Sequence, residues 1–285
     1  MIHILEHTLM DVIKLVPFLF ITYLIMEYIE HKTSESFKNT IKKAGKVGPL
    51  FGGLLGAFPQ CGFSAAASGL YAGRVITVGT LIAIYLSTSD EMLPILISEK
   101  VDVLVILKIL GIKIFIGILI GFIVDLFLSR FIVTKEDDEG IEHLCHHDHC
   151  HCEKSLIKSA IKHTLQIFVF IFIITLALNL IIHHVGENAL SNLILDKKVI
   201  GPLLAGIVGL IPNCASSVVI TQLYLSNVIS FGAMLAGLLV GAGVGVLILF
   251  KVNSHRLKEN IKILCTLYVL GVLAGIVVEL LGVVI

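Results

Sequence analysis

The chain has 285 residues, of which 56% are hydrophobic and 15% are charged, and its mean hydropathy is +0.99. This composition excludes an ordinary soluble domain, and several windows exceed the roughly 18 uncharged residues that indicate a membrane-spanning helix. Its 21 basic and 21 acidic residues balance, so nothing in the charge points to a nucleic-acid partner. We therefore predict an all-α polytopic membrane protein that binds no nucleic acid.

The first half of the chain contains four apolar segments, and polar residues or proline interrupt three of them. Asp11, Lys14 and Pro17 interrupt residues 7–30, and residues 48–73 are rich in glycine and contain Pro59, whereas residues 103–129 form a cleaner span. Residues 75–98 are apolar at both ends but carry five consecutive polar side chains in the middle: Ser87, Thr88, Ser89, Asp90 and Glu91. Carboxylates at that depth of a bilayer must face protein or water.

The second half repeats the first after a long polar loop. Gly-Pro-Leu begins at Gly48 and again at Gly201, and each copy continues to a break at Pro59-Gln60-Cys61 or Pro212-Asn213-Cys214. The register then holds without a gap as far as Gly79, pairing Ser64 with Ser217, Tyr71 with Tyr224 and Gly79 with Gly232. The last apolar segments of the two halves also match, pairing Lys108 with Lys262 and Asp125 with Glu279. The chain thus divides into a first transmembrane repeat (1–130), a loop (131–158) and a second transmembrane repeat (159–285).

Basic residues predict that the two repeats are inverted. In the first repeat the lysine-rich connection (32–46) follows the first apolar segment, whereas in the second repeat the basic connection (251–258) precedes the last one. The positive-inside rule therefore places equivalent connections on opposite sides of the membrane. It also places the loop on the cytoplasmic side and both termini outside.

Inversion requires an odd number of crossings in each repeat, so one of the four segments must be broken. Each arm beside Pro59 has about 12 residues and spans roughly 18 Å, too short for a hydrocarbon core of roughly 30 Å. We expect residues 48–73 and 201–226 to form re-entrant hairpins; the alternative is a break at Ser87 to Glu91, matched by Gly241 to Gly245. Either break must line a cavity or be buried in protein near the membrane midplane, as in secondary transporters.

The Pro-x-Cys breaks are the first candidate substrate site. A proline bends a helix and frees a backbone carbonyl. Thiolates select soft metals and metalloids, whereas amide and hydroxyl oxygens suit harder cations such as manganese. The alternative is that the cysteines only pack as small apolar residues. The candidate substrate-binding residues here are Gln60, Cys61, Ser64, Asn213, Cys214 and Ser217.

The polar run is the second candidate, because carboxylates with hydroxyls can bind a divalent cation. Its five members, Ser87 to Glu91, are all candidate substrate-binding residues. The second copy has Gly243 and Val244 where the first has Asp90 and Glu91, which makes a scaffold role for the acids hard to explain. The alternative is a solvated turn or a structural ion pair with Lys108 or Arg74.

The polar loop is the third feature that favours metal, because imidazoles and thiols at high density bind zinc, copper, nickel or cobalt. It lies outside the repeats, so we expect it to sense or collect metal rather than to form the transport site. The alternative is a linker that binds metal incidentally. Its candidate ligands are His143, Cys145, His146, His147, His149, Cys150, His151 and Cys152.

Together, the two Pro-x-Cys breaks, the Ser-Thr-Ser-Asp-Glu run and the His-rich loop resemble the family of ten-helix heavy-metal exporters. Members of that family are labelled arsenic efflux proteins or manganese transporters. The resemblance covers nearly the whole chain and implies a bacterial or archaeal permease of the inner (plasma) membrane with five helices in each half.

We therefore predict a transporter rather than an enzyme. Gly45-Lys46 is followed by Val47, so the sequence has no phosphate-binding loop of the P-loop type, and we expect transport to be secondary-active, driven by an ion gradient or by the gradient of the substrate. It would export a divalent metal such as manganese or zinc through metal ligands Asp90, Glu91, Cys61 and Cys214, with no required cofactor. Its expected partners are the metal or metalloid ion, the lipid bilayer and a second copy in a homodimer. The alternatives are a permease for arsenite or an organic arsenical, and a membrane metal sensor or channel that uses the His-rich loop.

Overall fold

The computed structural model describes residues 45–58, 61–89, 92–133 and 200–283, together with short runs between residues 8 and 24 and between residues 157 and 177. Within these residues every regular element is a helix, which confirms the all-α prediction. Several predicted site residues lie outside the described part: Gln60, Asp90, Glu91, the side chains of Cys61 and Cys214, and the His-rich cluster at 143–152.

From residue 45 on, the described part of the first half consists of short helices followed by one long one. They are α3 (Gly48–Gly56), α4 (Cys61–Ala72), α5 (Val78–Ser87), α6 (Met92–Ser98) and α7 (Val103–Ile123), with a 3-10 turn, η1 (Gly45–Val47), before them. A π-helix, η2 (Val124–Leu128), and α8 (Ser129–Ile132) continue α7. The chain is therefore broken both before Cys61 and after Ser87, whereas the sequence alone left these as alternatives.

The second half repeats the same series. From residue 200 on, its described helices are α12 (Ile200–Gly209), α13 (Cys214–Leu225), α14 (Phe231–Val240), α15 (Val244–Val252) and α16 (Leu257–Leu280), with the 3-10 turn η3 (Ser254–Arg256) between the last two. Here too the chain breaks before a cysteine and again after the following helix. The breaks around Gly241 to Gly243 and around Ser87 to Glu91 thus occupy equivalent positions.

Equivalent residues of the two halves also make equivalent contacts. In the first half the backbone N of Gly79 donates to Asp125 Oδ1 at 2.7 Å, and the Thr77 hydroxyl donates to Asp125 Oδ2 at 2.6 Å. In the second half the backbone N of Gly232 donates to Glu279 Oε2 at 3.1 Å. Each carboxylate thus satisfies a donor in the first turn of a broken helix, where anions are stabilised. The predicted pairing of Asp125 with Glu279 is confirmed.

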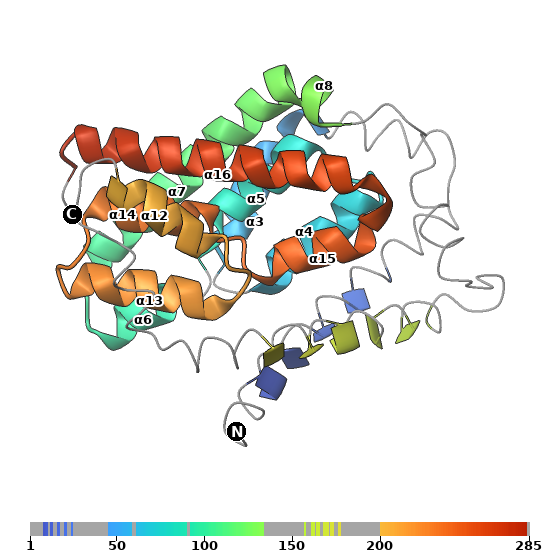
Figure 1. The fold of residues 1–285 in the computed structure, drawn as a ribbon, viewed down its shortest axis with the longest axis horizontal. Helices are drawn as coiled ribbons and strands as arrows, with labels where there is room; N and C mark the ends of the chain where they lie inside the picture. The colour runs from blue at the N-terminus through green and yellow to red at the C-terminus, as the bar shows by residue number, and fades with distance from the viewer. Residues whose placement is uncertain are drawn as a thin grey trace.

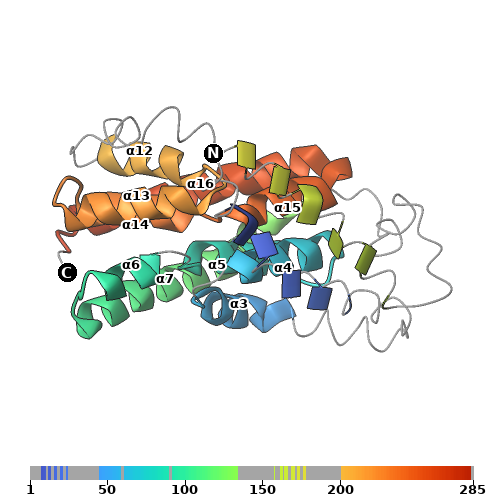
Figure 2. The same ribbon diagram turned by 90° about the horizontal axis from the view of Figure 1, so that it is seen from below.

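The two halves form two layers that exchange contacts at their ends. Figure 2 shows the first half (blue to green) below the second (orange to red). Within the first layer α3, α5 and α7 pack on one another, and α12, α14 and α16 do the same in the second. Across the layers α4 packs on α15 and α13 packs on α6. These two pairs lie at opposite ends of the molecule (Figure 1).

Glycines allow the helices within each layer to cross closely. A Cβ atom built on Gly121 would lie 2.7 Å from the Gly79 carbonyl oxygen, and one built on Gly275 would lie 2.7 Å from the Gly232 carbonyl oxygen. No side chain fits at these distances, so α7 meets α5, and α16 meets α14, backbone to backbone. Small residues at a helix interface allow this close approach of the two backbones.

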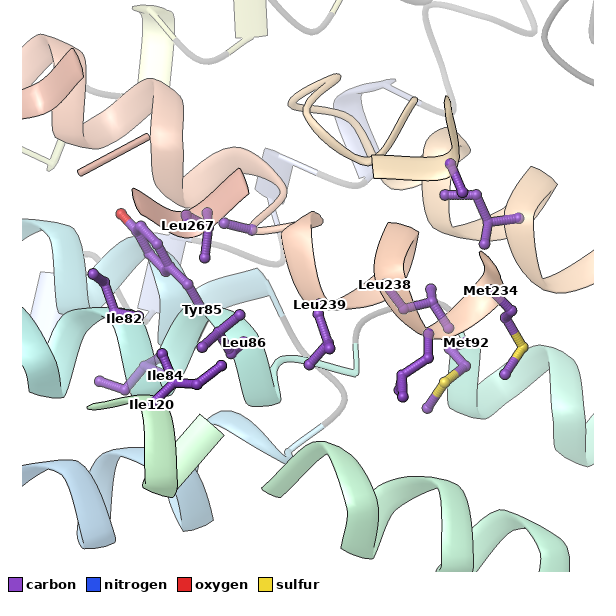
Figure 3. Packing of buried hydrophobic residues seen from close by; sticks show 14 of the residues in the cluster. Ile82, Ile84, Tyr85, Leu86, Met92, Ile120, Met234, Leu238, Leu239 and Leu267 are labelled. Carbon is purple, nitrogen blue, oxygen red and sulfur yellow. The ribbon is translucent and has the colours of Figure 1, made fainter. Parts of the chain in front are cut away.

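The core joins the layers, and the outside is apolar. Side chains of α5 and α6 belong to the same buried cluster as side chains of α14 and α16 (Figure 3). Outward-facing residues of α7 such as Leu104 and Phe115 are each 66% exposed, as expected for a surface that contacts lipid. Four stretches of the described chain are long and apolar enough to cross a membrane: Val78–Ser98, Val103–Ile132, Phe231–Val252 and Ser254–Leu280.

Candidate substrate site at the helix breaks

In the first half, the end of α3 lies against the break that follows α5. In the second half, the end of α12 lies against the break that follows α14. The Ser89 hydroxyl donates to the Ala57 carbonyl at 2.6 Å, so the residue after α3 contacts the α5–α6 break. In the second half, a Cβ atom on Gly241 would lie 3.7 Å from the Gly209 carbonyl oxygen. The last residue of α12 is therefore beside the α14–α15 break. Breaks that are far apart in sequence adjoin within each layer.

Contacts between α4, α5 and α15 bring the breaks of the two halves together. The Ser68 hydroxyl lies 2.7 Å from the Gly245 carbonyl oxygen and 2.7 Å from the Tyr85 hydroxyl oxygen. A Cβ atom on Gly245 would lie 2.8 Å from Ser64 Cβ. Ser64 is in the first turn of α4 and Gly245 is in the first turn of α15, so each follows a break. The predicted residue Ser64 is fully buried at this junction.

The hydroxyls of the polar run are buried in protein and bonded to the backbone. Ser87, Thr88 and Ser89 are each at most 2% exposed. Ser87 Oγ donates to Ala83 O at 2.7 Å and Thr88 Oγ1 donates to Ile84 O at 2.7 Å. A hydroxyl that donates its proton in this way keeps lone pairs that can accept from, or coordinate, another group. The hydroxyl oxygens of these three residues therefore have lone pairs that can accept a further hydrogen bond or coordinate a cation.

The Pro-x-Cys residues lie where two helices begin. Cys61 is the first residue of α4 and Cys214 is the first residue of α13, at equivalent places in the two halves. Asn213 is the N-cap of α13, and its Oδ1 accepts from Ala215 N at 3.1 Å. Asn213 is 6% exposed, and Ser217, one turn further along α13, is half-buried. The Asn213 side-chain oxygen thus acts as a helix cap.

The expectation that proline frees a carbonyl is wrong for Pro212. In an uninterrupted helix the nitrogen of residue 212 would donate to the Val208 carbonyl, and proline has no N–H for that bond. Ile211 N donates to Val208 O instead, at 3.1 Å. The chain tightens to a 3-10 turn before the proline, so this carbonyl keeps a partner.

Lys113 is a member of this region that sequence reasoning missed. It lies in the middle of α7 and is 1% exposed. Its Nζ donates to the Thr88 carbonyl of the first half and to the Leu238 carbonyl of the second, the latter at 3.1 Å. Comparison of the two repeats could have identified it. The pairing of Lys108 with Lys262 makes Leu267 the equivalent of Lys113, so a charged residue is present at this position in one copy only.

Arg74, which the sequence offered as a partner for the polar run, forms an ion pair with Glu259. Its two guanidinium nitrogens donate to Glu259, at 2.8 Å to Oε1 and 3.0 Å to Oε2, and the Tyr71 hydroxyl donates to the same Oε1 at 2.6 Å. Glu259 is fully buried at the start of α16. This network joins the end of α4 to the start of α16.

No group of three or more His, Cys, Asp or Glu side chains gathers among the described residues in a way that could hold a metal ion. That search does not reach Asp90, Glu91 or the cluster at 143–152, which lie outside the described part. Within the described chain, the breaks therefore contribute carbonyl and hydroxyl oxygens together with one lysine.

These features define a multi-pass helical membrane protein whose two similar halves meet at broken helices. A protein-family model described as "Putative, 10TM heavy-metal exporter" matches residues 2–181 and 152–283. Because the matched ranges together cover nearly the whole chain, the protein belongs to this family. Searches of curated proteins and of solved structures found no match to the chain.

Proposed function

We propose that the protein is a secondary-active transporter that exports a divalent transition-metal ion, such as manganese or zinc, across the inner membrane. The observation that carries this proposal is the meeting of helix breaks from both halves in the protein interior. Irregular backbone within a membrane protein is tolerated where it is buried or lines a cavity, and secondary transporters place their substrate sites at such breaks.

The exchange of helices between the layers supports two inverted repeats, residues 1–130 and 159–285. The α4–α15 pair and the α13–α6 pair lie at opposite ends of the molecule (Figure 1). A two-fold axis in the membrane plane produces this placement, and alternating access then arises when one half rocks against the other. We place both termini outside and the His-rich loop in the cytoplasm, where it would collect metal for export.

Asp90 and Glu91 are the proposed source of negative charge at the site. They directly follow Ser87, Thr88 and Ser89 in the sequence, whose buried hydroxyls all donate to backbone carbonyls. The acceptor of the Ser89 hydroxyl is the Ala57 carbonyl, just after the end of α3. Carboxylate and hydroxyl oxygens suit manganese and similar hard or borderline cations. The thiols of Cys61 and Cys214 would add soft ligands for a metal such as zinc.

A permease for arsenite or an organic arsenical is the second candidate. The observation that favours it is the position of the two cysteines, each the first residue of a helix after a break and each equivalent to the other. Thiolates bind soft metals and metalloids without help from carboxylates. The two functions therefore depend on different side chains.

The contrast between carboxylates and thiols provides the test. We expect cells that express the wild type to contain less of one divalent metal, and we expect Asp90→Asn combined with Glu91→Gln to abolish that decrease. The Cys61→Ala, Cys214→Ala double variant should keep export of a hard cation such as manganese. The measurement is the cellular content of metals from manganese to zinc, and of arsenic after exposure to arsenite.

The matched control is Glu99→Gln, which neutralises an exposed carboxylate eight residues beyond Glu91 and should export like the wild type. A fall in arsenic alone, lost in the cysteine variant and kept in the carboxylate variant, would contradict metal export and support the arsenical permease.

A further inference from the structure

Lys113 places a positive charge between the helix breaks of the two halves. It is 1% exposed, and its Nζ contacts one backbone carbonyl from each half. Thr88 is the first residue after α5, and Leu238 lies in the last turn of α14. Ionisable side chains buried at this depth of a membrane protein are rare and usually mark the path of an ion or substrate.

The Leu238 carbonyl is accessible to Lys113 because α14 stops. In a continuous helix this carbonyl would accept from the nitrogen of Ala242. Ala242 N donates instead to Val240 O at 2.9 Å. Thr88 has left the helical conformation (φ −54°, ψ 129°), so its carbonyl also lies beyond the regular helix. Carbonyls of broken helices are the groups with which transporters coordinate cations.

The charge of Lys113 is not a requirement of the fold. The equivalent residue of the second half is Leu267, which is also fully buried. A shorter apolar side chain therefore suffices for packing at this place in a helix that makes equivalent contacts. The lysine occurs in the same half of the sequence as Asp90 and Glu91, and the second copy has no charged residue at any of these three positions.

We propose that Lys113 is a tethered cation that holds the Thr88 and Leu238 carbonyls when the site is empty and is displaced from them by the transported metal ion. This inference rests on the proposed function and adds a residue that sets the affinity of the site. Exchange of one cation for another keeps the buried carbonyls satisfied at every stage, and the return of the ammonium group helps to expel the metal. No proton transfer is needed.

A lysine that competes with the metal ion affects transport kinetics differently from a lysine that only stabilises the fold. Like charges a few ångströms apart in a site of low dielectric constant repel strongly, so Lys113 should weaken metal binding and accelerate release. Lys113→Met removes the charge and keeps the length of the side chain. We expect this variant to lower the KM for the metal about tenfold or more and to lower kcat as well, because release becomes slower.

The experiment measures initial rates of Mn²⁺ and Zn²⁺ uptake into sealed vesicles that contain the full-length purified protein. Lys113→Gln is the second neutral variant, because its amide can still donate to the carbonyls, and it should show the same fall in KM. Lys113→Arg keeps the charge and should keep a wild-type KM. The matched control is Lys108→Met, an exposed lysine on the same helix, for which KM and kcat should not change.

Three results would overturn the inference. The first is an unchanged or higher KM in both neutral variants while the wild type transports metal, which leaves the proposed function standing. The second is loss of folded protein in both neutral variants with recovery only in Lys113→Arg, which identifies a structural brace. The third is a wild type that moves neither Mn²⁺ nor Zn²⁺, and in that case the proposed function fails together with the inference.

Discussion

Replacement of Gly121 by valine is expected to prevent stable folding. A Cβ atom at this position would lie 2.7 Å from the Gly79 carbonyl oxygen, 2.8 Å from Ala83 Cβ and 2.9 Å from Pro49 Cβ. These atoms belong to the backbone or to short side chains of α3 and α5, so none can turn away. Overpacking of a tight site costs typically about 1–3 kcal/mol, and a rigid three-sided contact should reach or exceed the upper end.

The same helix supplies the control for this prediction. Gly111 is also in α7, and a Cβ atom built there meets no atom within 4 Å. Gly111→Val should therefore leave the yield of monodisperse protein and the midpoint of thermal unfolding in detergent close to wild type. If Gly121→Val behaved like Gly111→Val in both measurements, the close crossing of α7 with α3 and α5 would be wrong.

Glu259→Met should lower the free energy of unfolding by about 3 kcal/mol or more, the second large effect that we expect. The substitution leaves the Arg74 guanidinium and the Tyr71 hydroxyl without the carboxylate that accepts from both. The Arg74 side chain is 24% exposed, so water satisfies it only in part. Removal of one partner of a buried ion pair is strongly destabilising, because it leaves an uncompensated charge.

The double variant Arg74→Met, Glu259→Met separates this explanation from a loss of packing. Replacement of both partners by apolar residues should recover much of the lost stability. The measurement is the midpoint of thermal unfolding of the two single variants, the double variant and Glu99→Gln, which removes an exposed carboxylate. Additive losses in the double variant would show that the ion pair does not couple α4 to α16.

The repeat could be predicted because the residues that define it make equivalent contacts in both halves. Gly79 and Gly232 meet the carboxylates of Asp125 and Glu279, respectively, and the small residues of α7 and α16 lie at matching crossings. Such contacts constrain residue type strongly, so they persist in two otherwise divergent copies. Hydropathy located the apolar segments for a similar reason, since lipid-facing and buried residues are both apolar.

The breaks were only partly predictable. Proline correctly indicated that α12 ends before α13, but the local 3-10 turn gives the Val208 carbonyl a partner that the sequence did not predict. The α14 break contains no proline, and the glycines Gly241 and Gly243 permit the conformation without requiring it. At Gly243 the backbone has φ of 54°, which favours glycine. Glycines that permit a helix break can be found in the sequence, but the sequence does not show at which of them the helix actually breaks.

The contacts of the ionisable residues could not be predicted from the sequence. Arg74 pairs with Glu259, 185 residues away in the chain. Lys113 donates to the backbone carbonyl of Leu238. Every residue has such a carbonyl, so the residue type at position 238 does not reveal the contact. A single sequence offers no pairing information across such separations. Comparison of the two copies does give some information about ionisable residues. A charged residue that is replaced by an apolar one in the other copy, such as Lys113 by Leu267, is not required by the fold that the copies share.

The measurement that tests the central claim most directly is the flux of Mn²⁺, Zn²⁺ and arsenite into sealed vesicles that contain only the purified wild-type protein and lipid. We predict saturable flux of at least one divalent cation and none of arsenite, with empty vesicles and the Asp90→Asn, Glu91→Gln variant as controls. Saturable arsenite flux without divalent-cation flux would contradict the metal-export function.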